Sequence, residues 1–468
     1  MANVLRVPAA VLALVLSGCS LGPVYRRPAV DVPATFVATP ATAETAWPAA
    51  EWWRGFGSPE LDGLIATARA NNTDLAAAAA RIVQADAQVG ISSAPLLPTI
   101  QGSANDDYQR SGLNGSRSLG GRRYIDNRSY RIGPSASYDL DFWGRNRAFA
   151  EAAQASAVAT RFDQVTVALN VVTSVAQTYF QFLAAQDRLG VARRNLADSE
   201  RILAAFRARL SVGTSNALDV SQQEALVANQ RAQIPALRNN AEQQRLGLGI
   251  LIGQPPERLA IDGGTLEKLA LPPVTPGLPS ALLARRPDVA NAEAQLVAQN
   301  ANIRAARAAF YPTITLTASG GLSSAALSAI TGPGTVVAAL GAALTQTIFD
   351  NGQRQGQLDQ SRGRYDELLA NYRRTTLQAF TDTEQSLTAF QYTTEQEALT
   401  RQAVAVAQRS SDIGKAQLAA GTIDIITSLN TQTTLYNDLD QLTQVRLARF
   451  QALLNLYKAL GGGWVGPQ

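Results

Sequence analysis

Long stretches with a helical period and short stretches with a period of two alternate along the 468-residue chain. From Arg145 to about Val212 there is no proline, the only interior glycine is Gly190, and good helix formers dominate. A helix of this length spans on the order of 100 Å. After a turn at 212–215, a second helical run returns from Leu218 to about Ile252. The pattern predicts a long helical hairpin.

The same pattern recurs 208 residues further on. The second long helix is expected from Gln353 to Leu418, the turn at 420–422, and the return helix from Ile425 to Leu460. The glycines that bound the helices keep this offset: Gly144 with Gly352, Gly213 with Gly421, and Gly253 with Gly461. The chain is therefore a duplicated helical hairpin rather than two or three ordinary domains.

A shorter helix precedes each hairpin. Ser58 and Pro59 have the residue types of an N-cap and a first helical position, and this helix is expected to run to about Ser93. The second half matches it at an offset of 214, which aligns Asp74 with Asp288. The duplication therefore includes the first helix.

The period changes to two after Pro98 and again after Pro312, which predicts strands over about 98–143 and 312–350. Each half has two strands of roughly ten or more residues, long enough to cross a bilayer when tilted. Only closed barrels place strands in a membrane, and about eight strands are the practical minimum, so several chains must share one barrel. The alternative is a small soluble sheet with one face exposed to water. The polar face is neutral and rich in hydroxyl groups, which favours the barrel.

The N-terminus has the pattern of an export signal. Arg6 precedes an apolar run from Val7 to Leu16, which is too short to span a bilayer and is typical of a signal peptide. The run ends in Leu16-Ser17-Gly18-Cys19, which resembles the bacterial lipobox and holds the only cysteine. This resemblance implies S-diacylglycerol and N-acyl chains on Cys19, which anchor a protein stably in lipid. The residue after Cys19 is Ser20 and not an aspartate, and by the same resemblance this implies the outer membrane. The alternative is an ordinary signal peptide with an incidental cysteine.

Composition excludes most enzymatic and metal-binding chemistry. The chain has no histidine and one cysteine, which removes the usual general base, most metal sites and a disulfide framework. No glycine-rich phosphate loop or nucleophile elbow is present, so we expect no cofactor and no enzymatic activity. The formal charges of residues 110–131 sum to +5, while the net charge of the whole chain is +4. The protein is therefore not basic throughout, and nucleic-acid binding is not expected. This loop is either solvated surface or a contact for lipopolysaccharide phosphates.

Several short motifs together are characteristic of one family. Besides the lipobox they are Trp52-Trp53 with Phe56 and Pro59, Arg286-Pro287-Asp288 with Glu293, Tyr311-Pro312, Ile348-Phe349-Asp350-Asn351-Gly352, and Leu456-Tyr457-Lys458-Ala459-Leu460-Gly461-Gly462-Gly463-Trp464. On these motifs the chain resembles the TolC-like outer membrane factors, specifically the NodT/OprM-type lipoprotein branch of RND efflux systems. The resemblance implies a mainly α fold with a transmembrane β portion. Duplicated long helical hairpins would form an α-barrel, and four strands per chain would join a shared trimeric β-barrel.

The resemblance also implies a function. The homotrimer would be the outer-membrane exit duct of a tripartite efflux pump, extending into the periplasm. It would passively conduct small molecules, such as drugs and toxic compounds, from an inner-membrane pump of the RND type through a periplasmic adaptor (membrane fusion) protein to the exterior. Two alternatives are a lipid-anchored duct for type I protein secretion and a coiled-coil lipoprotein scaffold without a pore.

Two sets of site residues follow from the resemblance. The hairpin turns would contact the adaptor, and they are Val212, Gly213, Thr214, Ala420, Gly421 and Thr422. In relatives the helix after the second turn carries an apolar ring and a carboxylate ring that narrow the pore, and here these positions are Ile426 and Asn430. Three asparagines neither repel one another nor hold cations as carboxylates do, which leaves Asp424 as the candidate for the missing charge.

The expected organisation has six segments. They are a signal peptide (1–18), a lipidated extended segment (19–58), a first repeat (59–261), a linker (262–280), a second repeat (281–461) and a C-terminal tail (462–468). Within the extended segment, we expect Trp52, Trp53 and Phe56 to pin the chain against a helix.

Overall fold

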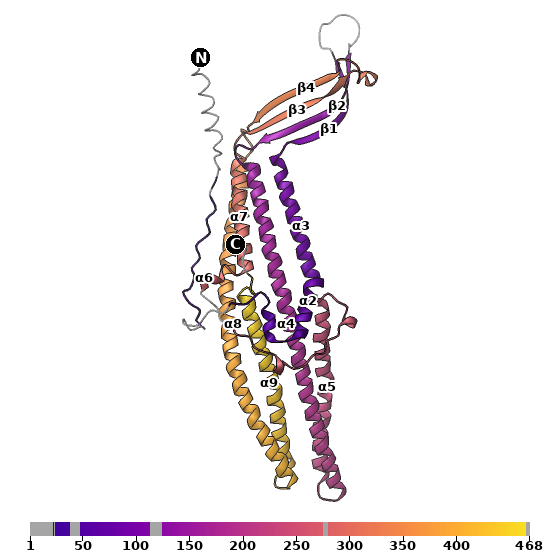
Figure 1. Ribbon diagram of the computed structural model, residues 1–468, viewed down its shortest axis with the longest axis vertical. Helices are drawn as coiled ribbons and strands as arrows, with labels where there is room; N and C mark the ends of the chain where they lie inside the picture. The colour runs from indigo at the N-terminus through magenta and orange to yellow at the C-terminus, as the bar shows by residue number, and fades with distance from the viewer. Residues whose placement is uncertain (1–21, 23, 38–46, 113–123, 275–278, 465–468) are drawn as a thin grey trace. The chain divides into compact units, whose positions relative to one another are not determined.

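The computed structural model describes residues 22, 24–37, 47–112, 124–274 and 279–464 (Figure 1). These residues divide into two compact units, and each unit takes segments from both halves of the chain. The first unit comprises residues up to Pro28, 82–159 and 293–371; the second comprises 29–81, 160–292 and 372–468.

The first unit contains a four-stranded antiparallel sheet in the order β1-β2-β3-β4 (Figure 1). The strands are β1 (Thr99–Gly112), β2 (Tyr124–Leu140), β3 (Thr313–Ser324) and β4 (Val336–Thr345). The register places Ile100, Ala136, Ala318 and Leu340 in one row across the sheet. β1 and β4 are its two edges, so each leaves one side of its backbone without a partner strand among the described residues.

Helices adjoin the strands in the same unit. They are the later part of α3 (Thr73–Ser93), most of α7 (Pro287–Ala308) and the beginnings of α4 (Arg145–Ser211) and α8 (Gln353–Ala419). The starts of α4 and α8 have the same local structure. Gly144 and Gly352 take positive φ of 71° and 84°, and the carboxylates of Asp141 and Asp350 accept hydrogen bonds from the first backbone amides. The long helices α4 and α8 therefore begin with equivalent N-terminal caps.

The predicted duplication of the hairpins is visible in the lengths of the helices. α4 and α8 each have 67 residues, and the return helices α5 (Ala217–Leu251) and α9 (Ile425–Ala459) each have 35. Corresponding helices begin 208 residues apart, as the glycine pattern indicated. The fold is thus mainly helical with one small antiparallel sheet, as the sequence predicted.

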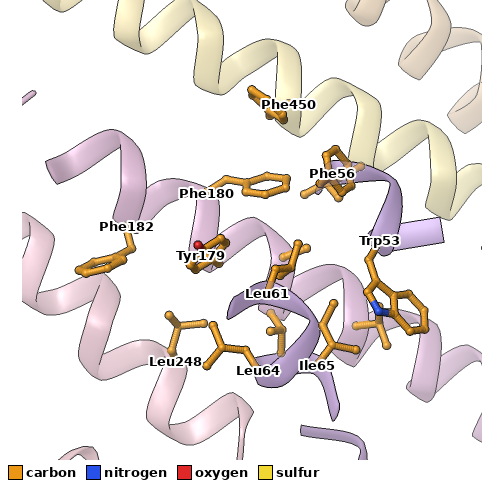
Figure 2. Packing of buried hydrophobic residues seen from close by; sticks show 14 of the residues in the cluster. Trp53, Phe56, Leu61, Leu64, Ile65, Tyr179, Phe180, Phe182, Leu248 and Phe450 are labelled. Carbon is orange, nitrogen blue, oxygen red and sulfur yellow. The ribbon is translucent and has the colours of Figure 1, made fainter. Parts of the chain in front are cut away.

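The core of the second unit is built on aromatic side chains from helices far apart in the sequence (Figure 2). The short 3-10 helix η1 (Trp52–Phe56) supplies Phe56, whose ring lies 5.0 Å from that of Phe180 on α4 and 6.0 Å from that of Phe450 on α9. Trp52 stacks on Tyr457 at 4.7 Å, which confirms that the tryptophans pin the N-terminal segment against a helix. Such aromatic contacts add about 0.5–1.5 kcal/mol each beyond the burial of their apolar area.

The helix expected to run unbroken from Ser58 to about Ser93 is two helices. α2 (Pro59–Asn71) and α3 are separated at Asn72, whose ψ of 129° is extended. The Asn72 side chain accepts hydrogen bonds from the amides of Asp74 and Leu75 and donates to the Leu251 carbonyl at 2.7 Å. The break is therefore stabilised by a partner that is distant in the sequence, and the expectation of one helix was wrong.

The remaining short elements lie in the connections. They are η2 (Ala94–Leu96), η3 (Pro256–Arg258), η4 (Leu266–Lys268), α6 (Pro279–Leu282) and η5 (Leu327–Ala329). The strands expected as far as about 350 stop at Thr345, and the side chain of the next residue, Gln346, donates to the carbonyls of Phe310 and Thr347. Within the described part of the chain, none of the helices combines the length and the apolar character needed to cross a membrane.

Candidate functional site

The two hairpin tips have the same backbone geometry. Gly213 and Gly421 end α4 and α8 with φ of +74° and +72°. The amide of Thr214 donates to the Arg209 carbonyl at 2.9 Å, and that of Thr422 to the Gln417 carbonyl at 3.0 Å, the six-to-one bond of a Schellman motif. No atom of the described residues lies within 4 Å of a Cβ added at either glycine, so the positive φ, and not a crowded contact, requires glycine.

The six predicted tip residues are all exposed. They are Val212, Gly213, Thr214, Ala420, Gly421 and Thr422. The tips differ in one respect, because Val212 is a large exposed apolar side chain and the corresponding Ala420 is small. Both tips expose backbone and small side chains to solvent, and the first tip also exposes the apolar side chain of Val212.

Asp424 is the N-cap of α9. Its carboxylate accepts a hydrogen bond from the Thr427 amide at 2.7 Å, as the side chain of Asn216 does from Asp219 at the start of α5. Hydrogen bonds from the backbone and side chain of Thr427 lower the pKa of Asp424 below its ordinary value. Asp424 therefore carries a full negative charge at neutral pH, and capping alone accounts for an acceptor side chain at this position.

Ile426 and Asn430 lie one helical turn apart on the exposed face of α9. Ile426 is 54% exposed, while the adjacent Ile425 is 5% exposed and packs against Phe206 of α4 and Val220 of α5. The residue 208 positions before Ile426 is Leu218, which is 64% exposed at the same place in the first hairpin. The counterpart of Ile425 in α5 is Ala217, which is exposed, so the two hairpins share the outward apolar position but not the buried one.

Polar contacts join the two hairpins along their length. Near the tips, Arg209 of α4 donates to the carbonyl of Ala419 at the end of α8 at 3.2 Å, and Lys415 of α8 pairs with Asp198 of α4 at 3.2 Å. Further along, Arg188 of α4 makes a bidentate pair with Asp440 of α9 at 2.6 and 3.1 Å. These residues could not be predicted from the sequence, because their partners are more than 200 positions away and no local motif marks them.

The sheet has two chemically distinct faces, because side chains alternate along each strand. One face carries apolar residues such as Ile100, Ile132, Leu316, Leu340 and Leu344, many of them strongly exposed. The other face carries hydroxyl and amide side chains, among them Gln101, Ser103, Ser135, Ser137, Thr313, Thr315, Thr317 and Ser319. The strands therefore keep the alternation that the sequence predicted.

Two predicted features cannot be placed. Cys19 and half of the basic segment 110–131, namely residues 113–123 with Arg117, Arg122 and Arg123, lie outside the described residues. The rest of that segment belongs to β1 and β2 and not to a loop as expected. Among the residues that are described, no group of three or more acidic, histidine or cysteine side chains is arranged to hold a metal ion.

Similarity to known proteins connects this architecture to a family. The family model for outer membrane efflux proteins matches residues 64–254 and 278–462, one segment in each half of the chain. The pyoverdine export outer membrane protein OpmQ of Pseudomonas aeruginosa is 40% identical over 455 residues, which cover 96% of this chain and 95% of OpmQ. The chain belongs to the outer membrane efflux protein family. The resemblance inferred from the short motifs is confirmed.

Two further relatives of this family member agree in sequence and fold. The cation efflux system protein CusC of Escherichia coli K12 is 30% identical over 458 residues, which cover 97% of this chain and 98% of CusC. The open state of the MtrE outer membrane channel of Neisseria gonorrhoeae matches with a TM-score of 0.85 and 29% identity, over 95% of this chain and 98% of that one. This family member is thus an outer-membrane efflux channel protein, and its family consists of channels rather than enzymes.

Proposed function

We propose that three copies of this chain form one exit duct of a tripartite efflux pump. The observation that carries the proposal is the open sheet, in which β1 and β4 each have a free edge and one face is apolar. An open sheet cannot lie in lipid, because its unpaired backbone groups would lose their hydrogen bonds to water. Pairing β4 of one copy with β1 of the next gives twelve strands from three copies, above the minimum of about eight.

A stripe of exposed apolar side chains on α8 supports association of the hairpins as well. Tyr392, Leu399, Val406 and Ile413 are all more than half exposed and recur every seven residues. A strict repeat of seven is typical of a seam between supercoiled helices. The positions 208 residues earlier on α4 include Asp198 and do not form such a stripe. We infer that the α8 stripe packs against a neighbouring copy.

The hairpin tips are the proposed contact with a periplasmic adaptor. The exposed Schellman turns at 212–214 and 420–422 leave room for a partner to approach the backbone closely. The adaptor would connect the duct to an inner-membrane pump of the RND type. The duct itself is passive in this proposal, because the outer membrane holds no energy source of its own.

The constriction is proposed at the start of α9. Ile426 would supply the apolar ring, Asn430 an uncharged polar ring one turn further along, and Asp424 a carboxylate at the helix end. Since Asp424 already caps the helix, its charge is fixed in place and near the proposed ring.

Small organic molecules are the proposed cargo, and a siderophore of the pyoverdine type is the leading candidate. This proposal rests on the 40% identity with OpmQ, which is described as a pyoverdine export protein. The chain offers soft metal ions no histidine, and its single methionine and cysteine are Met1 and Cys19 at the N-terminus. Organic cargo is therefore favoured over a cation cargo of the CusC kind, and over a protein.

Acyl chains on Cys19 would anchor the duct in the membrane. Loss of palmitate labelling in Cys19→Ala tests this.

Disulfide cross-linking tests the shared barrel. We would replace Gln101 of β1 by cysteine together with one of Ala339, Gly341 or Ala343 of β4, all on the polar face, in a Cys19→Ala background. Because β1 and β4 are opposite edges of one sheet, cross-links form only between copies. At least one pair should give covalent trimers on oxidation. The matched control is Gln101→Cys with Ser135→Cys, which lie opposite each other in β1 and β2 of one chain, so oxidation should leave monomers. Monomers from every β1–β4 pair would contradict the proposal.

A further inference from the structure

β1 and β2 stay paired with each other beyond the point where β3 stops pairing with β2. Their register continues as far as Gly112 opposite Tyr124. β3 follows β2 only as far as Ser324 opposite Tyr130. Past Tyr130 the two strands therefore continue as a two-stranded ribbon (Figure 1).

The chemistry of the apolar face changes at this same row. Before it, β1 and β2 carry Ile100, Ala104 and Ile132 on that face. From this row onward, six alternating positions on the same face form what we call the ribbon patch: Asp106, Tyr108, Arg110, Tyr124, Asp126 and Arg128. An apolar band bordered by tyrosines is the pattern with which membrane strands leave the hydrocarbon region for the head-group region.

The charges of the ribbon patch are ordered by direct contacts. Arg128 donates through Nε and Nη2 to the two carboxylate oxygens of Asp106, at 3.0 and 2.6 Å. Arg110 pairs with Asp126 at 3.2 Å, and the hydroxyl of Tyr108 donates to the same oxygen at 2.9 Å. The guanidinium carbon of Arg110 also lies 4.6 Å from the ring centre of Tyr124. Each arginine is thus held close to the sheet by a carboxylate and an aromatic ring.

Both guanidinium groups keep donors available. A guanidinium has five N–H groups, and the bidentate pair of Arg128 uses two of them. The side chains of Arg110 and Arg128 are 57% and 53% exposed. Exposed ion pairs add little to folding stability, so stability alone does not account for this arrangement.

We propose that the ribbon patch binds phosphate groups of lipid head groups in the leaflet through which the ribbon leaves the membrane. The inference rests on the proposed function, since it takes the apolar face of the sheet to lie against lipid. Arginine forks match phosphate oxygens geometrically, and two forks held on one rigid ribbon lose little entropy when they bind. The patch has two arginines and two aspartates, so recognition depends on oriented donors more than on net charge.

Native mass spectrometry of the purified full-length protein tests the proposal. The probes are diphosphoryl lipid A and digalactosyldiacylglycerol, which has no phosphate, each titrated into the same non-ionic detergent. Wild type should bind the phosphorylated lipid at least about tenfold more tightly, since a charge-assisted contact to phosphate is a strong one. Arg110→Gln/Arg128→Gln should lose most of this preference. Equal binding of the two lipids by wild type would overturn the proposal.

Arg131 provides the matched control. It lies on β2 as Arg128 does, but on the opposite, hydroxyl-bearing face. Arg131→Gln should leave the preference within about twofold, and a loss as large as that in the double variant would contradict the assignment to one face. If the double Gln variant does not assemble, Arg110→Lys/Arg128→Lys keeps the charges without the forks; weakened phosphate preference supports the proposal and unchanged preference contradicts it.

Conductance in planar phosphatidylcholine bilayers separates this inference from the proposed function. Wild-type protein that conducts but shows no preference for phosphorylated lipid contradicts the inference alone. Protein that never inserts contradicts the proposed function itself.

Discussion

Glu397 on α8 and Arg446 on α9 form a buried ion pair, in which Arg446 Nε donates to the Glu397 carboxylate at 3.1 Å. Arg449 donates to the other carboxylate oxygen at 3.0 Å, and Glu397 is only 2% exposed. The residue 208 positions earlier, in the first hairpin, is Leu189, which is buried at 8% exposure. At equivalent positions, the second hairpin therefore buries a carboxylate and the first buries an apolar side chain.

Glu397→Gln should destabilise the second hairpin by about 3 kcal/mol, because it leaves Arg446 and Arg449 with a weaker partner in a buried site. Burial opposes ionisation, but hydrogen bonds from Arg449 and Arg446 outweigh it and lower the pKa of Glu397 below its ordinary value. A lowered folded pKa contributes stability above the unfolded pKa of about 4.3, and this is lost as pH falls through the folded value. The thermal midpoint of wild type should therefore fall more steeply below about pH 4.3 than that of Glu397→Gln.

Glu367→Gln is the control for this prediction. Glu367 also pairs with an arginine, Arg364, but both side chains are more than half exposed. Its loss should change the midpoint little, since exposed pairs contribute at most about 1 kcal/mol. Identical midpoints and pH profiles for wild type, Glu367→Gln and Glu397→Gln would show that the buried pair does not hold α8 and α9 together.

Gly213→Ala and Gly421→Ala should loosen the hairpin tips. An alanine at φ near +70° costs about 1–2 kcal/mol, although nothing in this chain blocks its Cβ. Hydrogen exchange should accelerate at the amides of Thr214 and Thr422, which close the two tips. Gly356→Ala is the control, because Gly356 lies inside α8 on an exposed position without crowding, and alanine there should be neutral or stabilising. Equal exchange at the tips in all variants would contradict the Schellman geometry.

Leu399→Asp should weaken the trimer, because it places a charge in the middle of the α8 stripe. Ala405→Asp adds the same charge to an exposed position of α8 about 120° around the helix from Leu399. Native mass spectrometry in detergent should show monomers for Leu399→Asp and trimers for Ala405→Asp and wild type. Trimers of unchanged stability in Leu399→Asp would mean that this face stays in contact with solvent.

The duplicated architecture could be predicted because its signals are local. A helix that ends in a Schellman turn needs a residue that adopts positive φ, so Gly213 and Gly421 mark both tips in the sequence. The strands were predictable for a similar reason, because alternation shows directly in residue order. The family motifs around Trp52 correspond in the structure to its stack on Tyr457.

What the sequence did not reveal depends on contacts between distant residues. The break at Asn72 is stabilised by the Leu251 carbonyl, 179 positions away, so a continuous helix was the better local prediction and was wrong. The pairs Arg188–Asp440 and Glu397–Arg446 have no signature before the helices are placed side by side. Asp424 was expected only as a charge near the pore, and its position as the N-cap of α9 became visible in the hydrogen bond to Thr427.

The conductance of the purified, lipidated protein in planar bilayers tests the proposed trimeric duct most directly. Wild type should give a small conductance, limited by the ring of Ile426 side chains. Ile426→Ala widens that ring and should raise the conductance several-fold, while Asn430→Asp should make the pore more selective for cations because it adds a ring of carboxylates. The absence of conductance from all three proteins, together with extraction as a monomer, would contradict the account.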